Sequence, residues 1–196
     1  MKPLPTSWTD VTLAQYYQVI SIFKLFKEDW IEIAIRLISL FSEQNKKEIE
    51  KINVSDLMKQ YNQLAFLSEL PENEQLPAII KIQDKTFKSC LLTSDMTAGQ
   101  FMDFNNCGKG CDGEELIYHA HELIACMCLT KTTDGWVYEG FDKTSETFEQ
   151  MSVADAYPFY VFFCKVLSNL QKPILEYSRN QIRTNLKQMT KILQSV

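Results

Sequence analysis

The chain has 196 residues, of which 45% are hydrophobic and 23% are charged. These fractions are typical of a globular domain, so they exclude a chain that is disordered throughout. The 20 basic and 25 acidic residues leave a net charge of −5, which argues against nucleic acid as the main partner.

The N-terminal region is predicted to be helical. Residues 12–15, Thr-Leu-Ala-Gln, have the form of a capping box, in which the two polar side chains satisfy backbone N–H groups at a helix start. A helix is therefore expected over residues 13–27, where apolar residues fall at helical spacing. Two prolines keep the preceding segment extended, and we expect Trp8 to pack it back onto the helices.

Three further helices are expected in this region. Asp29 is a suitable N-cap residue, and Glu32 follows it three residues later at the start of an apolar stripe. The other two helices are predicted over residues 46–51 and 55–70, the latter ending before Pro71.

The middle of the chain changes character. Residues 78–82 and 86–91 are β-branched and partly alternating, which predicts a β-hairpin. Asp84 and Lys85 are expected to form its two-residue turn, although the glycine favoured there is missing. Residues 97–100 repeat the capping-box form, so a short helix should follow.

A glycine-containing loop is predicted at residues 105–113, followed by a helix over residues 114–129. Residues 130–144 are rich in turn formers, and residues 136–138, Trp-Val-Tyr, predict a second short strand.

The C-terminal part is predicted to be helical again. Residues 152–155 form one more helix start, and an aromatic helix should continue to about residue 170. Pro173 then begins a last helix that reaches Gln194.

Together these elements predict a mainly α fold of the α+β class. We expect a helical domain with one or two small β-hairpins in the middle and a long C-terminal helix. The predicted body covers residues 1–171, with its mixed segment at 78–144, and the basic C-terminal helix covers residues 172–196.

The C-terminal helix carries a candidate protein-binding surface. Its apolar residues follow heptad spacing, and its charged residues are mostly basic, whereas the body is acidic. Three readings stay open: the helix docks on its own body, it binds a neighbouring copy or partner, or it is a last core helix with a solvated basic face. The candidate contact residues are Ile182, Leu186, Met189 and Leu193, with Arg183, Lys187 and Lys191 setting the orientation.

A cluster of cysteines and histidines lies within residues 107–128. Thiolate and imidazole are the ligands that tetrahedral zinc prefers, and Cys107, Cys111 and His119 are the candidate ligands. However, the cluster contains no C-x-x-C spacing, and cysteines in an apolar run usually behave as small core residues. We therefore predict no cofactor, and keep a metal-stabilised protein-binding module as the alternative function.

Catalytic signatures are absent from the sequence. His121-Glu122 lacks the second histidine of a metalloprotease motif, and the spacing of Gly108, Gly110 and Gly113 lacks the strand that a dinucleotide site needs. A Cys/His catalytic pair would have no local signature. We predict that the chain is not an enzyme.

Three stretches of the sequence resemble a known group of proteins. They are residues 7–17 (Ser-Trp-Thr-Asp-Val-Thr-Leu-Ala-Gln-Tyr-Tyr), residues 96–104 (Met-Thr-Ala-Gly-Gln-Phe-Met-Asp-Phe), and residues 151–156 (Met-Ser-Val-Ala-Asp-Ala). Their order and spacing are similar to those of small tail assembly chaperone-like and virion-associated proteins of tailed bacteriophages. The resemblance spans roughly residues 7–165 and transfers no catalytic residue.

The resemblance implies a role in phage morphogenesis, as a tail assembly chaperone or a virion structural component. The implied partners are other phage structural or tail proteins, with a homo-oligomer as a further possibility, and neither nucleic acid nor a membrane. The N-terminus lacks the apolar stretch of a secretory signal, and six cysteines suit a reducing compartment. The expected location is the host cytoplasm during assembly, with the virion as the alternative.

Overall fold

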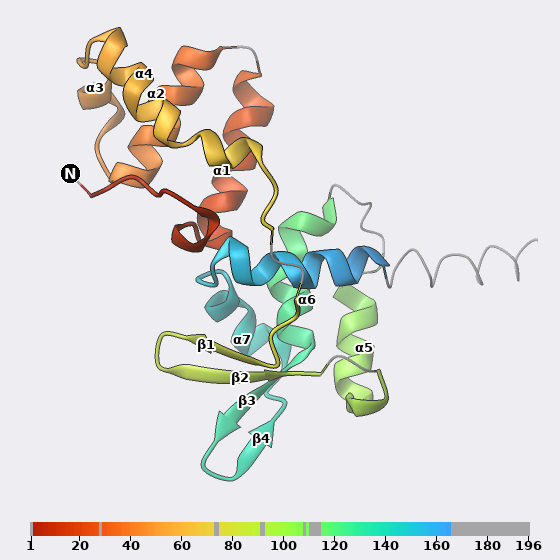
Figure 1. Cartoon of the computed structure of the whole chain (residues 1–196). Coiled ribbons are helices and arrows are strands. Elements are labelled where there is room, and N and C mark those ends of the chain that lie inside the picture. Colours follow the sequence, from red (N-terminus) through yellow and green to blue (C-terminus); the bar gives the residue numbers. More distant parts are fainter. Residues whose placement is uncertain are drawn as a thin grey trace, which may run out of the picture. The chain divides into compact units, whose positions relative to one another are not determined.

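The computed structural model describes residues 2–27, 29–72, 75–90, 93–107, 109 and 115–165. The chain divides into two units, residues 1–159 and 160–196, and the fold is described here for the first. It is mainly helical with a small antiparallel sheet in its middle, which confirms the predicted fold class (Figure 1). Among the described residues, no helix is long and apolar enough to cross a membrane.

The N-terminal helices begin at the predicted capping residues. The Thr12 hydroxyl accepts from the Gln15 N–H at 3.2 Å, while the Gln15 side chain accepts from the Thr12 N–H at 3.0 Å. The Asp29 carboxylate likewise accepts from the Glu32 N–H at 3.1 Å. The helices are α1 (Leu13–Phe26), α2 (Trp30–Ser42), α3 (Lys46–Ile49) and α4 (Val54–Gln63).

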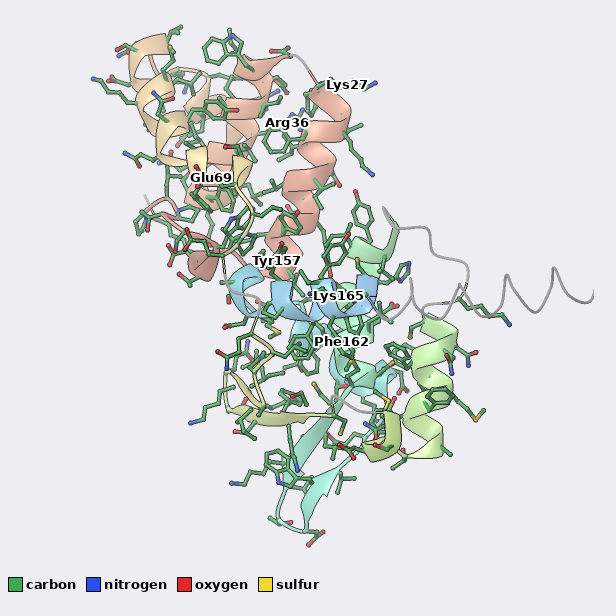
Figure 2. All side chains as sticks on the ribbon, turned by 45° about the vertical axis from the view of Figure 1, so that its right-hand side comes forward. Lys27, Arg36, Glu69, Tyr157, Phe162 and Lys165 are labelled. Carbon is green, nitrogen blue, oxygen red and sulfur yellow. The ribbon has the colours of Figure 1, made fainter. Side chains whose placement is uncertain are left out.

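Helix α2 is the centre of this helical region, because it packs against α1, α3 and α4. Its buried residues include Leu37, Ile38 and Phe41, which together form a continuous apolar face. On the α1 side, the Arg36 guanidinium lies 4.2 Å from the centre of the Phe26 ring (Figure 2).

The predicted helix over residues 55–70 is shorter in the structure. Helix α4 ends at Gln63, and a 3-10 helix, η2 (Ala65–Ser68), follows it. This tighter turn places the Phe66 ring edge-on to Trp8, and the Trp8 indole N–H donates to the Glu69 carbonyl at 2.9 Å. The predicted role of Trp8 is thereby confirmed.

The sheet has four antiparallel strands in the order β1-β2-β3-β4. They are β1 (Ile79–Ile82), β2 (Lys85–Ser89), β3 (Cys128–Thr132) and β4 (Gly135–Val137). The first hairpin turns one residue earlier than predicted, at Gln83 and Asp84, because Ile82 pairs with Lys85. Gln83 supplies the positive φ, 54°, that a two-residue hairpin turn needs.

The predicted helix over residues 114–129 was wrong in its C-terminal part. A 3-10 helix, η4 (Glu115–His119), leads into α6 (Ala120–Cys126), and β3 begins two residues later. The apolar run at this point suits a buried helix and a buried strand equally well, and pairing with β2 decides for the strand.

Two other helices complete this region. Helix α5 (Ala98–Cys107) starts at the predicted capping box and runs three residues into the predicted loop at 105–113. Helix α7 (Phe141–Phe148) lies partly in the segment predicted as turn-rich. Only Thr144 and Phe148 of this helix are buried, so its sequence lacks the apolar periodicity from which a helix can be predicted.

A short antiparallel bridge between Thr12 and Ser152 joins two helix starts. The Leu13 N–H donates to the Met151 carbonyl, and the Val153 N–H donates to the Val11 carbonyl at 2.8 Å. Ser152 then caps a helix over residues 153–165, since its hydroxyl accepts from the Asp155 N–H. The predicted continuation to residue 170 and the predicted terminal helix over 172–196 lie outside the described residues.

Candidate functional site

The two faces of the sheet differ in character. The inner face carries the buried residues Ile80, Ile82, Phe87 and Thr130, and the Phe87 ring contacts Phe148 of α7 at 4.6 Å between ring centres. The strand register places the alternate residues on the opposite side, because neighbouring side chains of a strand point to opposite faces. This outer face consists of Ile79, Lys81, Thr86, Lys88, Leu129, Lys131 and Trp136.

The outer face combines exposed apolar groups with positive charge. Trp136 is 38% exposed and Ile79 is 47% exposed, so both side chains offer apolar surface on this face. The three lysines are exposed, and none of the seven outer-face residues is acidic. Within the described part of the chain, no ion pair joins these lysines to a carboxylate, and Asp84 and Asp134 lie in the flanking turns.

Two of the predicted cluster's cysteines meet in the structure. The sulfur atoms of Cys107, at the end of α5, and Cys126, at the end of α6, lie 3.6 Å apart. The hydrogen bond between them raises the pKa of the Cys126 thiol and lowers the pKa of Cys107. The pair joins the ends of two helices, and this contact was not predicted.

The other candidate metal ligands do not gather around this pair in the described residues. The His119 Nδ1 faces the Glu122 carboxylate at 2.8 Å, and Cys111 lies outside the described residues. No group of three His, Cys, Asp or Glu side chains with the geometry of a metal site occurs in the described part of the chain.

His121 instead belongs to a partly buried polar network with Tyr17 of α1. The His121 main-chain N–H donates to the Tyr17 hydroxyl at 3.4 Å, and that hydroxyl lies 3.0 Å from His121 Nδ1. The direction of the hydrogen bond between the Tyr17 hydroxyl and Nδ1 depends on which ring nitrogen carries the proton. Nε2 lies 3.6 Å from the Glu149 carboxylate, so the network links α1, α6 and the end of α7. Sequence reasoning missed it because its members are far apart along the chain.

This network predicts an acid-sensitive fold. Burial lowers the pKa of His121 below its ordinary value of 6.5, despite the nearby carboxylates of Glu122 and Glu149. In the unfolded chain this histidine binds a proton at a higher pH than it does in the folded protein. The free energy of unfolding should therefore fall as the pH drops below 6.5. The expected slope is at most about 1.4 kcal/mol per pH unit, measured by urea unfolding.

The chain offers a matched control, because it contains two histidines. The slope should diminish in His121→Gln and persist in His119→Gln, whose side chain is 42% exposed in the wild type. An acid slope that is the same in His121→Gln and the wild type would contradict the prediction.

The predicted protein-binding residues of the C-terminal helix lie outside the described residues. They are Ile182, Leu186, Met189 and Leu193, with Arg183, Lys187 and Lys191. Their role stays a prediction. The outer face of the sheet is the candidate interaction surface that the described part of the chain presents.

Comparisons with protein-family models, with curated proteins and with solved structures found no match to this chain.

Proposed function

We propose that the chain is a protein-binding factor of tailed-phage morphogenesis, acting as a tail assembly chaperone or as a virion component. The outer face of the sheet is the proposed surface for binding the partner protein. The resemblance of residues 7–17, 96–104 and 151–156 to the phage group supports the biological setting. Under this proposal the chain works in the host cytoplasm, and the virion component would remain in the particle.

The chemistry of the outer face favours a protein partner. Trp136, Ile79 and Leu129 provide apolar contact area, and aromatic residues are enriched in protein interfaces. Lys81, Lys88 and Lys131 surround them and favour an acidic partner surface. The net charge of −5 does not oppose this contact, because screening at physiological salt limits charge effects to about 8 Å.

The motifs behind the resemblance have structural roles in the fold. Thr12, Thr97 and Ser152 each accept a hydrogen bond from a main-chain N–H at a helix start, and Thr12 and Ser152 bridge to each other. These capping residues therefore stabilise the fold that holds the sheet in place. Under the proposal, the residues of the outer face determine which partner binds.

The proposal is tested by replacing two outer-face lysines in the phage that encodes the chain. We expect Lys88→Glu/Lys131→Glu to lower the yield of complete particles by about tenfold or more, because like charges at an interface exclude the partner. Lys47→Glu/Lys51→Glu makes the same charge change on two exposed lysines of the helical region and should leave the yield unchanged. Normal yield from the first variant, at normal protein level, would overturn the proposed binding face.

Mass spectrometry of purified particles decides the finer role. A fixed copy number relative to the major capsid protein identifies a virion component. Absence from particles, with abundance in the lysate, identifies an assembly chaperone. A source without phage genes would overturn the proposed morphogenesis function.

A further inference from the structure

We propose that the free edge of β1 receives an extended, acidic segment of the protein partner as a fifth strand of the sheet. The inference rests on the proposed protein-binding function and assigns it a docking mode. Strand addition is a recurring way in which sheets bind peptides, with main-chain hydrogen bonds supplying affinity and alternate side chains supplying specificity.

The backbone of β1 has the required free hydrogen-bonding groups. Among the strands that the structure describes, β1 lies at the edge of the sheet and pairs with β2 alone. The pairing of Ile82 with Lys85 closes the hairpin turn, and the Ser89 N–H donates to the Ala78 carbonyl. Because bonded and non-bonded pairs alternate in an antiparallel ladder, residues 78, 80 and 82 bond to β2. The N–H and C=O groups of Ile79 and Lys81 consequently point away from β2, and no hydrogen bond from another described residue reaches them.

Space for another strand lies beside this edge. A groove of about 830 Å³ runs along β1, and Gln150, Met151, Ser152 and Asp155 line it together with the strand. The four residues of β1 span about 13 Å at about 3.3 Å per residue, which suits a short added strand. The opposite edge, β4, is a poorer template, because it has three residues and begins at Gly135 with φ 121°.

Charge selects the kind of segment that fits. Lys81 is exposed and lies on the outer face beside the free edge. Two copies of the chain that paired through β1 in the antiparallel register centred on Lys81 would bring their Lys81 side chains together, and like charges on paired strands repel. An acidic strand has the opposite effect. Asp155 also lines the groove and accepts a hydrogen bond from the Ser152 hydroxyl at 2.8 Å, which leaves its charge in place. The positive charges of Lys81, Lys88 and Lys131 on the outer face outnumber it.

The test measures binding of a fluorescent synthetic peptide that alternates valine and glutamate to the purified full chain. Anisotropy titration should detect binding below about 1 mM and at least about tenfold weaker binding to Lys81→Pro. Proline removes the outward N–H and the charge of residue 81, and it spares the ladder because that N–H does not bond to β2. Lys47→Glu, on α3, should bind as the wild type does.

A second pair of peptides isolates the backbone contribution. Methylating the main-chain nitrogens of alternate residues removes the N–H groups of one peptide edge without changing a side chain. Of the two possible methylated peptides, one should lose binding and the other should retain it. A peptide that alternates valine and lysine should bind at least about tenfold more weakly, because Lys81 repels it.

Several outcomes would overturn the inference. They are no binding by the folded wild type, equal binding to Lys81→Pro, equal binding of both methylated peptides, and equal binding of the basic peptide. Displacement of the bound peptide by a thymidine oligonucleotide would assign the face to nucleic acid. Self-association of the wild type that Lys81→Pro abolishes would assign the edge to a second copy.

The particle assay separates this inference from the proposed function. Peptide binding that depends on Lys81, together with full particle yield from the outer-face variant, supports strand addition and overturns the outer face as the binding face of the proposed function. Loss of particles from the outer-face variant, with no peptide binding by the wild type, contradicts strand addition alone.

Discussion

Replacing Phe148 by alanine is expected to lower the free energy of unfolding by about 3–5 kcal/mol. Phe148 is the last residue of α7 and is 0% exposed, and its ring contacts Phe87, which is equally buried on β2. The two rings hold α7 against the inner face of the sheet, and α7 in turn packs against α6. Alanine would remove both the apolar burial and the ring contact and leave a cavity that the core cannot fill.

Urea unfolding followed by circular dichroism measures this loss. Phe101→Ala is the matched control, because Phe101 is 44% exposed on α5. Its substitution should change the free energy of unfolding by about 0.5 kcal/mol or less. Equal losses in the two variants would contradict the assignment of Phe148 to the core.

Replacing Gln100 by methionine is expected to cost about 2–4 kcal/mol, although methionine fills a similar space. Gln100 is 0% exposed, and its amide spans two elements. Its oxygen accepts from the Thr97 N–H at 3.0 Å, and its nitrogen donates to the Cys126 carbonyl at 3.3 Å. Methionine would leave the carbonyl of Cys126, which is 0% exposed, without this partner in the interior, and burying an unpaired carbonyl costs more than the hydrogen bond itself contributes. The Thr97 N–H belongs to an exposed residue, where water can replace the lost partner.

The chain contains an internal control for this effect. Gln15→Met changes the same position of the same capping box at the start of α1, where the residue is partly exposed. Water replaces the lost partner there, so the cost should be about 0.5–1 kcal/mol. Thermal or urea unfolding compares the two variants, and a loss at Gln15 as large as that at Gln100 would contradict the role of burial.

The outer face and the β1 edge form one continuous candidate surface. Lys81 and Ile79 belong to both, since they lie on the outer face and carry the outward backbone groups. A partner strand placed on the edge would extend the sheet and lie in line with the row from Lys81 to Trp136. Under the two proposals, the β1 edge supplies affinity through main-chain hydrogen bonds, and the adjacent outer face supplies specificity through its side chains.

The starts of the helices were readable from the sequence alone. Thr12, Asp29, Thr97 and Ser152 were each predicted to begin a helix, and each accepts the expected hydrogen bond from an N–H three residues later. These contacts are local, so the residue types and their spacing contain the necessary information.

The tertiary structure decided the features that depend on distant partners. The apolar run of Ile124 to Leu129 is helical up to Cys126 and is a strand from Cys128 onward. The strand forms because Cys128 and the residues after it pair with β2. The contacts of Tyr17 with His121, and of Cys107 with Cys126, join residues that no spacing rule connects. The outer face likewise exists because four strands pair in one register, which places three lysines and Trp136 on the same side. Local hydrogen bonds within one turn are determined by neighbouring residues, whereas strand pairing and packing are determined by which distant segments bury each other's surface.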